Sequence, residues 1–166
     1  MFWLLILRYI ETMQNRSSDN CSCGSNTPYS SCCGQFIENN NPAPTAEKLM
    51  RSRYTAYTFN NNDYLQKTWH ATTRPATLDL TQESQTEWLG LRICRTEAGG
   101  GNDASGSVEF IARYSNGGET AVIHEVSRFL KEDGRWYYVD GTLSQPSQNG
   151  ACPCGSGKKF KRCCGK

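Results

Sequence analysis

The sequence of 166 residues lacks several features that mark common classes of protein. It contains only two histidines, which excludes a histidine-rich metal triad. It has no glycine-rich phosphate-binding loop and no Gly-x-Ser-x-Gly nucleophile motif. The formal net charge is only +2, so the chain as a whole is not a polyanion binder, and no signal specific for DNA is present. These absences leave no motif that assigns the chain to a common enzyme class.

Long apolar runs are also missing. The most apolar stretch, residues 2–10, is nine residues long and is interrupted by Arg8, whereas a membrane-spanning helix needs about 20 apolar residues. A secretory signal would need a basic start and a small-residue cleavage site, and neither is found. Residues 1–12 are an interfacial anchor, a helix docked on the body, or an extension ahead of an alternative start at Met13, and we favour the last two. We treat residues 1–20 as an apolar extension and linker, and we expect no transmembrane span and a cytoplasmic protein.

Cysteine is the residue that the chain has in excess. There are nine cysteines, and eight of them lie in two short clusters near the two ends. Both clusters have the spacing Cys-x-Cys-x8-Cys-Cys, with Gly-Ser after the second cysteine and Gly after the last. The first cluster consists of Cys21, Cys23, Cys32 and Cys33, and the second consists of Cys152, Cys154, Cys163 and Cys164. One motif used twice therefore defines two small modules, residues 21–34 and 152–166.

Four cysteine side chains at this spacing suit a tetrahedral site for a soft metal ion, which is the arrangement of structural zinc sites. We expect two such sites with zinc as the metal, and iron is the alternative because it takes similar thiolate ligands. Disulfides would be another use of these residues, but an odd number of cysteines, adjacent pairs and the lack of a secretory signal argue against them. The ninth cysteine, Cys94, lies in a strand-like stretch and is expected to be a small core residue.

The two modules differ in charge. The C-terminal module holds five of the 18 basic residues and none of the 16 acidic residues, which leaves a net charge of −3 on the rest of the chain. With a divalent metal on four thiolates, the C-terminal module would carry about +3 and the N-terminal module about −2. We therefore interpret the N-terminal module as a structural clip and the C-terminal module as a docking site for a protein or ribosomal partner. The expected partner-binding residues are Lys158, Lys159, Phe160, Lys161 and Arg162.

Between the modules, residues 45–143 have the pattern of one α+β domain. Thr45 is a candidate N-cap for a first helix, and Asp63 is a candidate cap for a second helix that runs to about His70. Residues 78–86 suggest a short third helix. The buried stripe of the first helix is expected to consist of Leu49, Met50, Tyr54 and Tyr57.

Strand patterns follow these helices. Four stretches contain alternating apolar residues, at 88–95, 107–114, 119–130 and 136–140. The turn sequences Asn-Gly-Gly and Asp-Gly separate the last three of them. We expect the first strand to place Leu89, Leu91 and Ile93 on one face. The whole pattern predicts helices packed on one face of a curved four-stranded antiparallel sheet, flanked by the two four-cysteine modules.

These residues resemble a known family. The segment CPCGSGKKFKRCC (152–164) resembles the SEC-C motif, a metal module also found at the C-terminus of the SecA preprotein translocase. The arrangement of two such motifs around LMRSRYTAY (49–57), YLQKTWHATTRP (64–75) and DGRWYYVDG (133–141) resembles the YchJ family of bacterial proteins. The resemblance covers about residues 20–166. It implies that the middle domain has the cone of helices and bent sheet of nuclear transport factor 2 (NTF2).

The resemblance implies interaction rather than catalysis, because no reaction is assigned to the YchJ family. In SecA the motif recognises a chaperone partner, and related small modules are associated with ribosomes and protein export. This sequence departs from the family in its first motif, where Ser22 replaces a proline and residues 26–31 replace a basic run. The four cysteines are kept, so the departure bears on docking and leaves metal binding intact.

The alternative function is a small-molecule binder or an enzyme that uses a cavity of the cone. His70 would lie at the mouth of such a pocket with Asp63 as its orienting partner, unless it merely ends the second helix. His124 is either a satisfied core histidine or a pocket base. A cavity filled by Trp69, Trp88 and Trp136 would exclude this function. The candidate pocket residues are Arg53, Asp63, Trp69, His70 and His124, with Glu109, Arg113 and Glu125 as further polar groups.

Overall fold

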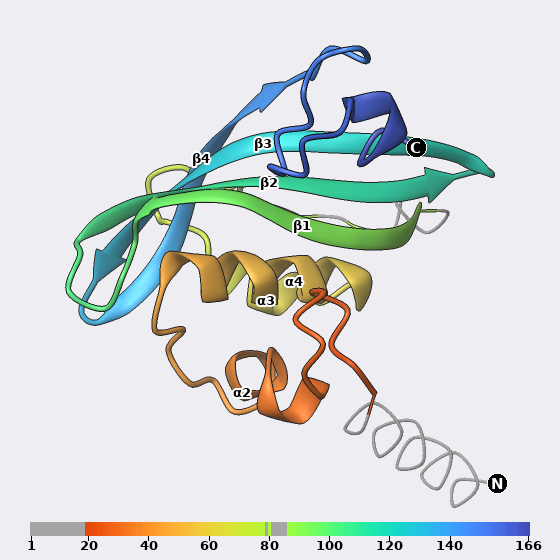
Figure 1. Cartoon of the computed structure of the whole chain (residues 1–166). Helices are drawn as coiled ribbons and strands as arrows, with labels where there is room; N and C mark the ends of the chain where they lie inside the picture. Colours follow the sequence, from red (N-terminus) through yellow and green to blue (C-terminus); the bar gives the residue numbers. More distant parts are fainter. Residues whose placement is uncertain (1–18, 79, 81–85) are drawn as a thin grey trace, which may run out of the picture.

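A computed structural model describes residues 19–78, 80 and 86–166 of the chain. The apolar segment 1–12 lies outside the described residues, and so does most of the short helix expected at 78–86. Figure 1 shows four layers: the C-terminal module, a curved sheet, two helices, and the N-terminal module with its short helix. No helix within the described part of the chain is long and apolar enough to cross a membrane.

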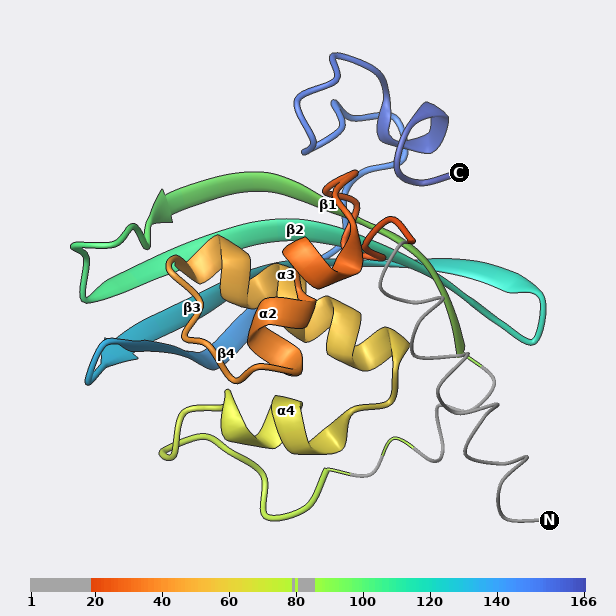
Figure 2. The ribbon, with the colours of Figure 1, turned by 90° about the horizontal axis from the view of Figure 1, so that it is seen from below.

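Two helices cover one face of the sheet (Figure 2). Helix α3 (Ala46–Thr58) begins as predicted, because the Thr45 side chain accepts a hydrogen bond of 3.1 Å from the backbone N–H of Lys48. Helix α4 spans Asn62–Lys67, and here the prediction was wrong at both ends. The cap is the Asn61 side chain, which accepts from the N–H of Tyr64, while Asp63 lies exposed in the first turn.

The sheet is an antiparallel meander in the order β1-β2-β3-β4, as predicted. Its strands are β1 (Thr86–Ala98), β2 (Ser105–Asn116), β3 (Glu119–Glu132) and β4 (Arg135–Ser144). The hairpin turns form where expected: Gly117 and Gly118 have positive φ in one, and Asp133 and Gly134 have positive φ in the other.

Strand β1 does not keep the simple alternation that the sequence predicts. Two register shifts, between Trp88 and Gly90 and between Ile93 and Arg95, reset which side chains face the helices. As a result Leu89 is 43% exposed, while Trp88, Leu91 and Ile93 pack against the core.

The main core lies between the helices and the inner face of the sheet. Leu49, Met50 and Tyr54 of α3 are buried in it, and Tyr57 packs on its border. Alternate residues of β2 complete it from the sheet side, including Val108, Phe110 and Ala112. The intervening residues of the strands point to the opposite face of the sheet, where the C-terminal module packs (Figure 1).

Short turns complete the two modules. The N-terminal module contains the 3₁₀ turn η1 (Tyr29–Ser31) and continues into helix α2 (Gly34–Ile37), and the C-terminal module contains the 3₁₀ turn η3 (Phe160–Arg162). The two turns occupy the same place in the repeated motif, eight residues after the first cysteine.

Candidate metal centres

The four cysteines of the N-terminal module converge on one buried point. Each offers a sulfur, and these sulfurs all lie within 4.8 Å of one another. The Sγ atoms of Cys23 and Cys32 are 3.6 Å apart, and those of Cys32 and Cys33 are 3.9 Å apart. The hydroxyl of Ser25 lies 3.1 Å from the sulfur of Cys32. All four cysteine side chains are buried.

The C-terminal module repeats this geometry. Its four cysteine sulfurs also lie within 4.8 Å of one another, with 3.6 Å between Cys154 and Cys163 and 3.9 Å between Cys163 and Cys164. Ser156 lies 3.2 Å from the sulfur of Cys163, as Ser25 lies beside Cys32. Cys152 and Cys164 are buried, whereas the other two cysteines are half-buried.

The backbone explains why the two sequences fold alike. The N–H of the first cysteine donates to a carbonyl six residues later, from Cys21 to Thr27 and from Cys152 to Lys158, at 2.8 Å in both modules. Glycine follows the second cysteine because the chain turns there with positive φ, 75° at Gly24 and 73° at Gly155. Local hydrogen bonds and glycine conformation thus set both cysteine clusters.

The donor set fits a metal ion. Zinc–sulfur bonds of about 2.3 Å in a tetrahedron place the sulfurs about 3.8 Å apart, close to the sulfur distances in both clusters. None of the nine cysteines, all of which lie among the described residues, forms a disulfide. The adjacent sulfurs of Cys32 and Cys33 are too far apart to be bonded to each other. Both clusters can therefore hold one metal ion each.

Crowding of the sulfurs sets their protonation. Hydrogen bonds from Cys23 and Cys33 lower the pKa of the Cys21 thiol to about 3, and the same contact raises the pKa of Cys33. In the C-terminal cluster burial opposes ionisation of Cys154, but hydrogen bonds from Ser156 and Cys152 outweigh it and bring its pKa to about 6. A thiolate is the form that binds metal, so the lowered pKa values of Cys21 and Cys154 favour metal binding.

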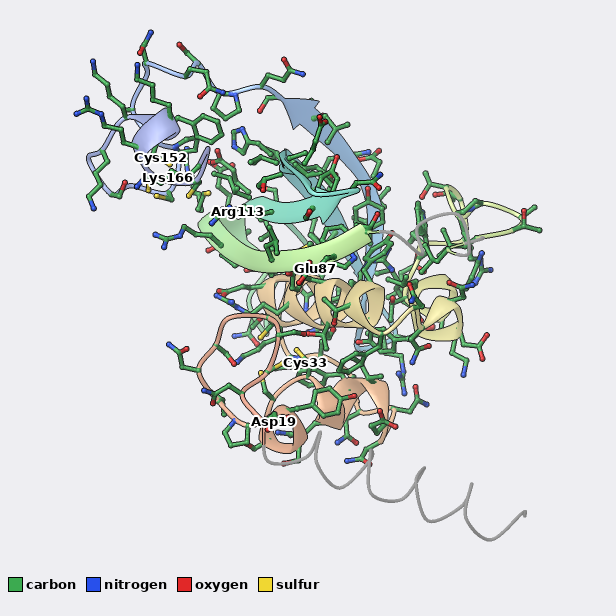
Figure 3. The ribbon with its side chains drawn as sticks, turned by 90° about the vertical axis from the view of Figure 1, so that its right-hand side faces the viewer. Asp19, Cys33, Glu87, Arg113, Cys152 and Lys166 are labelled. Carbon is green, nitrogen blue, oxygen red and sulfur yellow. The ribbon has the colours of Figure 1, made fainter. Side chains whose placement is uncertain are left out.

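The N-terminal cluster is built into the helix layer. The sulfur of Cys21 lies 3.6 Å from the hydroxyl of Thr55 on α3, and Arg51 of the same helix donates to the carbonyl of Cys23 at 2.9 Å. A Cβ atom on Gly24 would lie 3.1 Å from the carbonyl oxygen of Leu91 in β1. The module is therefore wedged between α3 and the edge of the sheet, and Cys33 lies beneath α3 in Figure 3.

The C-terminal cluster instead packs on the outer face of the sheet. Ile111 of β2, which is 1% exposed, forms a small core with Cys152, Phe160 and Cys164. Arg92 of β1 donates to the sulfur of Cys154 at 3.7 Å, and negative charge on the sulfurs of this cluster, that of Cys164 first, raises the pKa of that guanidinium.

Two further contacts seat this module. Arg113 of β2 donates to the carbonyl oxygen of Lys166 at 2.6 Å. Cys94 is half-buried against the C-terminal cluster and does not lie in the main core. It therefore packs apolar surface as predicted, but on the opposite face of the sheet.

The predicted partner-binding residues divide into two groups. Lys158, Lys159, Lys161 and Arg162 are exposed. Phe160 is only 4% exposed and points toward the sheet, because its ring fills the space between the cysteines and Ile111. The structure therefore corrects the grouping of Phe160 with the partner-binding residues: it is a packing residue of the module.

Comparisons with known proteins agree with this architecture. Residues 45–141, more than half of the chain, match the family model of the YchJ middle NTF2-like domain, and residues 149–166 match the SEC-C motif. The chain belongs to the YchJ family. Both the resemblance and the fold expected from the sequence are confirmed.

Two solved structures resemble this YchJ-family chain over most of its length. The solution structure of a SEC-C motif containing protein from Rhodopseudomonas palustris is 35% identical, covers 76% of this chain and 100% of its own, and superposes with a TM-score of 0.68. The crystal structure of a SEC-C motif containing protein from Psychrobacter arcticus is 31% identical, covers 90% of this chain and 97% of its own, and has a TM-score of 0.63.

The NTF2-like domain of this YchJ-family chain contains a cavity of about 210 Å³ between α3 and the sheet. Arg53 lines it, together with the polar residues Glu125 and Ser127. The cavity is not filled by the tryptophans: Trp88 forms part of its wall, whereas Trp69 and Trp136 are absent from its lining. The aromatic wall is formed by Tyr54, Tyr57, Trp88, Phe110 and Tyr138.

Arg53 is the unusual residue of this cavity. It is 3% exposed, which lowers the pKa of its guanidinium through desolvation. Its Nη1 donates to the carbonyl of Leu65 at 2.8 Å and to the hydroxyl of Thr68 at 2.7 Å, and the guanidinium lies over the ring of Trp69. Sequence reasoning named this residue, but nothing in the sequence indicated that it would be buried with no carboxylate of the described residues in hydrogen-bond contact.

The other predicted pocket residues lie elsewhere. The segment after α4 pairs with the edge of β4, where the N–H of His70 donates to the carbonyl of Tyr138 at 2.7 Å. The His70 ring then contacts Glu132 at 3.1 Å, and Asp63 is not its partner. His124 lies on the outer face of the sheet, so neither histidine reaches the cavity. The prediction of a shared pocket for Asp63, Trp69, His70 and His124 was therefore wrong.

Proposed function

We propose that this chain is a zinc-binding interaction protein whose C-terminal module docks on an acidic partner, a protein or the ribosome. Two four-sulfur clusters with the spacing of a tetrahedral site support metal binding. Zinc is favoured because a closed four-thiolate site is its usual structural environment, with iron as the competing occupant. Thiols held ready for a metal suit a reducing compartment, which supports the cytoplasm as the location.

The exposed cations of the C-terminal module are the observation that carries docking. Residues with the same local structure in the N-terminal module are uncharged: Thr27, Pro28, Ser30 and Ser31 stand where the C-terminal module has Lys158, Lys159, Lys161 and Arg162. Both modules hold their clusters by the same backbone hydrogen bonds, so the fold of the motif does not require these charges. A role in binding a partner at the surface explains these four charges.

Packing of the two modules supports the same division. A Cβ atom on Gly24 would meet β1, whereas a Cβ atom on the equivalent Gly155 would meet nothing within 4 Å. The N-terminal module therefore packs its cluster side against the body of the protein, which suits a clip. The C-terminal module touches the body through Ile111, Arg92 and Arg113 and leaves its cationic face free of the domain.

A charge-reversal experiment tests docking. Full-length protein with Lys158→Glu and Lys161→Glu is used as bait in cell extract, beside a control with Lys48→Glu and Lys67→Glu, which alters exposed lysines on α3 and α4. The first variant should lose a partner that the wild type and the control retain, and that partner should dissociate as salt is raised. A nuclease-treated extract separates a protein partner from ribosomal RNA. Equal retention by both variants would contradict the proposal.

Metal content tests the other half of the proposal. Elemental analysis of protein purified without added metal should give about two equivalents of zinc per chain. Iron in place of zinc would keep the proposed structural role of the N-terminal module and change only the identity of the metal. Absence of any metal, with disulfides detected by mass, would overturn the assignment of both clusters.

A second candidate function rests on Arg53. A desolvated cation at the wall of an aromatic cavity suits a small carboxylate with a flat apolar body. A thermal-shift screen of small aromatic carboxylic acids tests this, with Ile123→Phe as a control that fills the cavity from its β3 side. A shift in the wild type that the control lacks would favour it, and equal behaviour of the two proteins would exclude it.

A further inference from the structure

Three polar side chains form a hydrogen-bonded chain on the outer face of the sheet. Glu109 lies on β2, His124 on β3 and Ser144 at the end of β4. Oε1 of Glu109 is 2.7 Å from Nε2 of His124, and Oγ of Ser144 is 2.7 Å from Nδ1 of the same ring. A hydroxyl, an imidazole and a carboxylate are thus joined in series by two short hydrogen bonds.

Strand pairing fixes this arrangement. His124 is the direct partner of Ser144 in the β3–β4 ladder and of Ile111 in the β2–β3 ladder. Directly paired residues point to the same face, and Glu109 shares that face because it lies two residues from Ile111. The three side chains are held by the sheet, which is a rigid support for a site.

The three side chains differ in how deeply they are buried. The His124 side chain is 9% exposed and Glu109 is partly covered, while Ser144 is exposed. Ser144 also lines a surface hollow of about 570 Å³. Phe160 and Gly165 of the C-terminal module also line it, together with the linker after β4 through Gln145, Pro146, Ser147 and Gln148. The hydroxyl therefore faces an open space while the imidazole behind it is shielded from water.

We propose that Ser144, His124 and Glu109 form a nucleophilic triad that hydrolyses carboxylic esters of small acyl groups. This goes beyond the interaction function, which concerns the cationic face of the module and not the hollow beneath it. A serine, a base within hydrogen-bond reach and a third group that orients the base are the elements of such a site, and they are recognised by geometry and not by sequence order.

Each residue has a defined role in the reaction. Oγ of Ser144 forms a bond to the ester carbonyl carbon while its proton moves to Nδ1 of His124. The bond to the leaving alcohol then breaks, and the proton passes from Nδ1 to the leaving oxygen. Water attacks the acyl-serine in the same way, which releases the carboxylic acid and restores the hydroxyl. Glu109 accepts a hydrogen bond from Nε2–H throughout and stabilises the charged imidazole, so it is a positioning residue.

The ring is turned relative to the arrangement in serine proteases, because Nδ1 faces the nucleophile and Nε2 faces the acid. The proton balance is the same, since a neutral imidazole with its hydrogen on Nε2 leaves Nδ1 as the acceptor. Gln145 and Gln148 line the hollow, and amide side chains are one class of donor for a developing oxyanion. The size and polar walls of the hollow suit a small ester and do not suit a long acyl chain.

An activity-based probe tests the triad. Full-length, metal-loaded protein is treated with a fluorophosphonate, and the adduct is located by mass spectrometry. Wild-type protein should carry one adduct on Ser144, and Ser144→Ala should carry none. The matched control is Ser105→Ala, because Ser105 is an exposed serine at the start of β2 that does not line the hollow. Absence of an adduct on the wild type, or an adduct that persists in Ser144→Ala, overturns the proposal.

Hydrolysis of p-nitrophenyl acetate gives the second readout. Ser144→Ala and His124→Gln should each lower kcat by at least about 100-fold, while Ser105→Ala leaves it unchanged. Glu109→Gln should lower kcat without raising KM, and Glu109→Asp should recover part of the loss. The metal content and the melting temperature of each variant are measured beside its rate, so that a loss of activity is not mistaken for a loss of metal or of folding. A wild-type rate no higher than that of Ser144→Ala would refute the proposal.

Discussion

Replacement of Phe160 by alanine should remove the metal from the C-terminal module alone. The Phe160 ring is 4% exposed and forms the small outer core with Ile111, Cys152 and Cys164. Alanine would leave a void between the cluster and the sheet that the short 3₁₀ turn cannot close. Truncation of a buried phenylalanine costs about 3–5 kcal/mol when the surroundings do not collapse.

That cost should appear as a loss of metal affinity. A module of fifteen residues has too small a core to fold alone, so metal binding and folding of the module are one process. A loss of 3–5 kcal/mol then weakens metal binding by roughly 10²- to 10⁴-fold. In competition with a chromophoric chelator of suitable strength, the wild type should keep two equivalents and Phe160→Ala should keep one.

Phe160→Leu is the control for this experiment, because leucine fills most of the same volume and should cost less than about 1.5 kcal/mol. Thermal unfolding of the NTF2-like domain should change little in either variant, since its main core lies on the other face of the sheet. If Phe160→Ala retained two equivalents as tightly as the wild type, the ring would not support the cluster and the reasoning would fail.

Three further substitutions test other parts of the structure. Thr45→Ala removes the side chain that caps α3 and should lower the stability of the NTF2-like domain by about 1 kcal/mol, seen as a lower denaturation midpoint with an unchanged metal content. Gly34→Ala should expel metal from the N-terminal module, because its Cβ would lie 2.8 Å from the backbone oxygen of Tyr29, and metal analysis should then find one equivalent. Cys94→Ala should leave two equivalents in place, since Cys94 packs beside the C-terminal cluster without belonging to it. Burial raises the pKa of the Cys94 thiol to about 12, so its alkylation in the wild type should stay slow near neutral pH and accelerate only as the pH rises toward that value.

The two four-cysteine clusters could be predicted from the sequence because their geometry is local. Each cluster draws its four cysteines from thirteen residues or so, and the turns between them depend on glycine and on hydrogen bonds within the module. The meander of strands was predictable for the same reason, since its turns are marked by Asn-Gly-Gly and Asp-Gly. Local signals of this kind depend only on neighbouring residues, so they can be read from a single sequence.

Features that depend on distant contacts could not be predicted. The register shifts of β1 follow from its pairing with β2, so the alternation of Leu89, Leu91 and Ile93 alone misplaced Leu89. His124 meets its two partners across neighbouring strands, 15 and 20 residues away in the chain. Phe160 looked like an exposed aromatic among cations because nothing near it in sequence indicates that Ile111 would cover it.

Strand β1 connects these observations, because consecutive residues of it serve opposite sides of the molecule. The carbonyl of Leu91 lies close to Gly24 of the N-terminal module, and the side chain of Arg92 reaches the sulfur of Cys154 in the C-terminal one. Two modules with one fold thus meet the domain at neighbouring positions but in different environments. The cysteines of the N-terminal copy lie against α3, whereas the C-terminal copy stands outside the sheet. The surface turn of the N-terminal copy is nevertheless exposed at Pro28, Ser30 and Ser31. Because these positions are open to solvent in both copies, neither burial nor the fold of the motif accounts for charge at one end only, and a role of the C-terminal surface in binding, as proposed above, does.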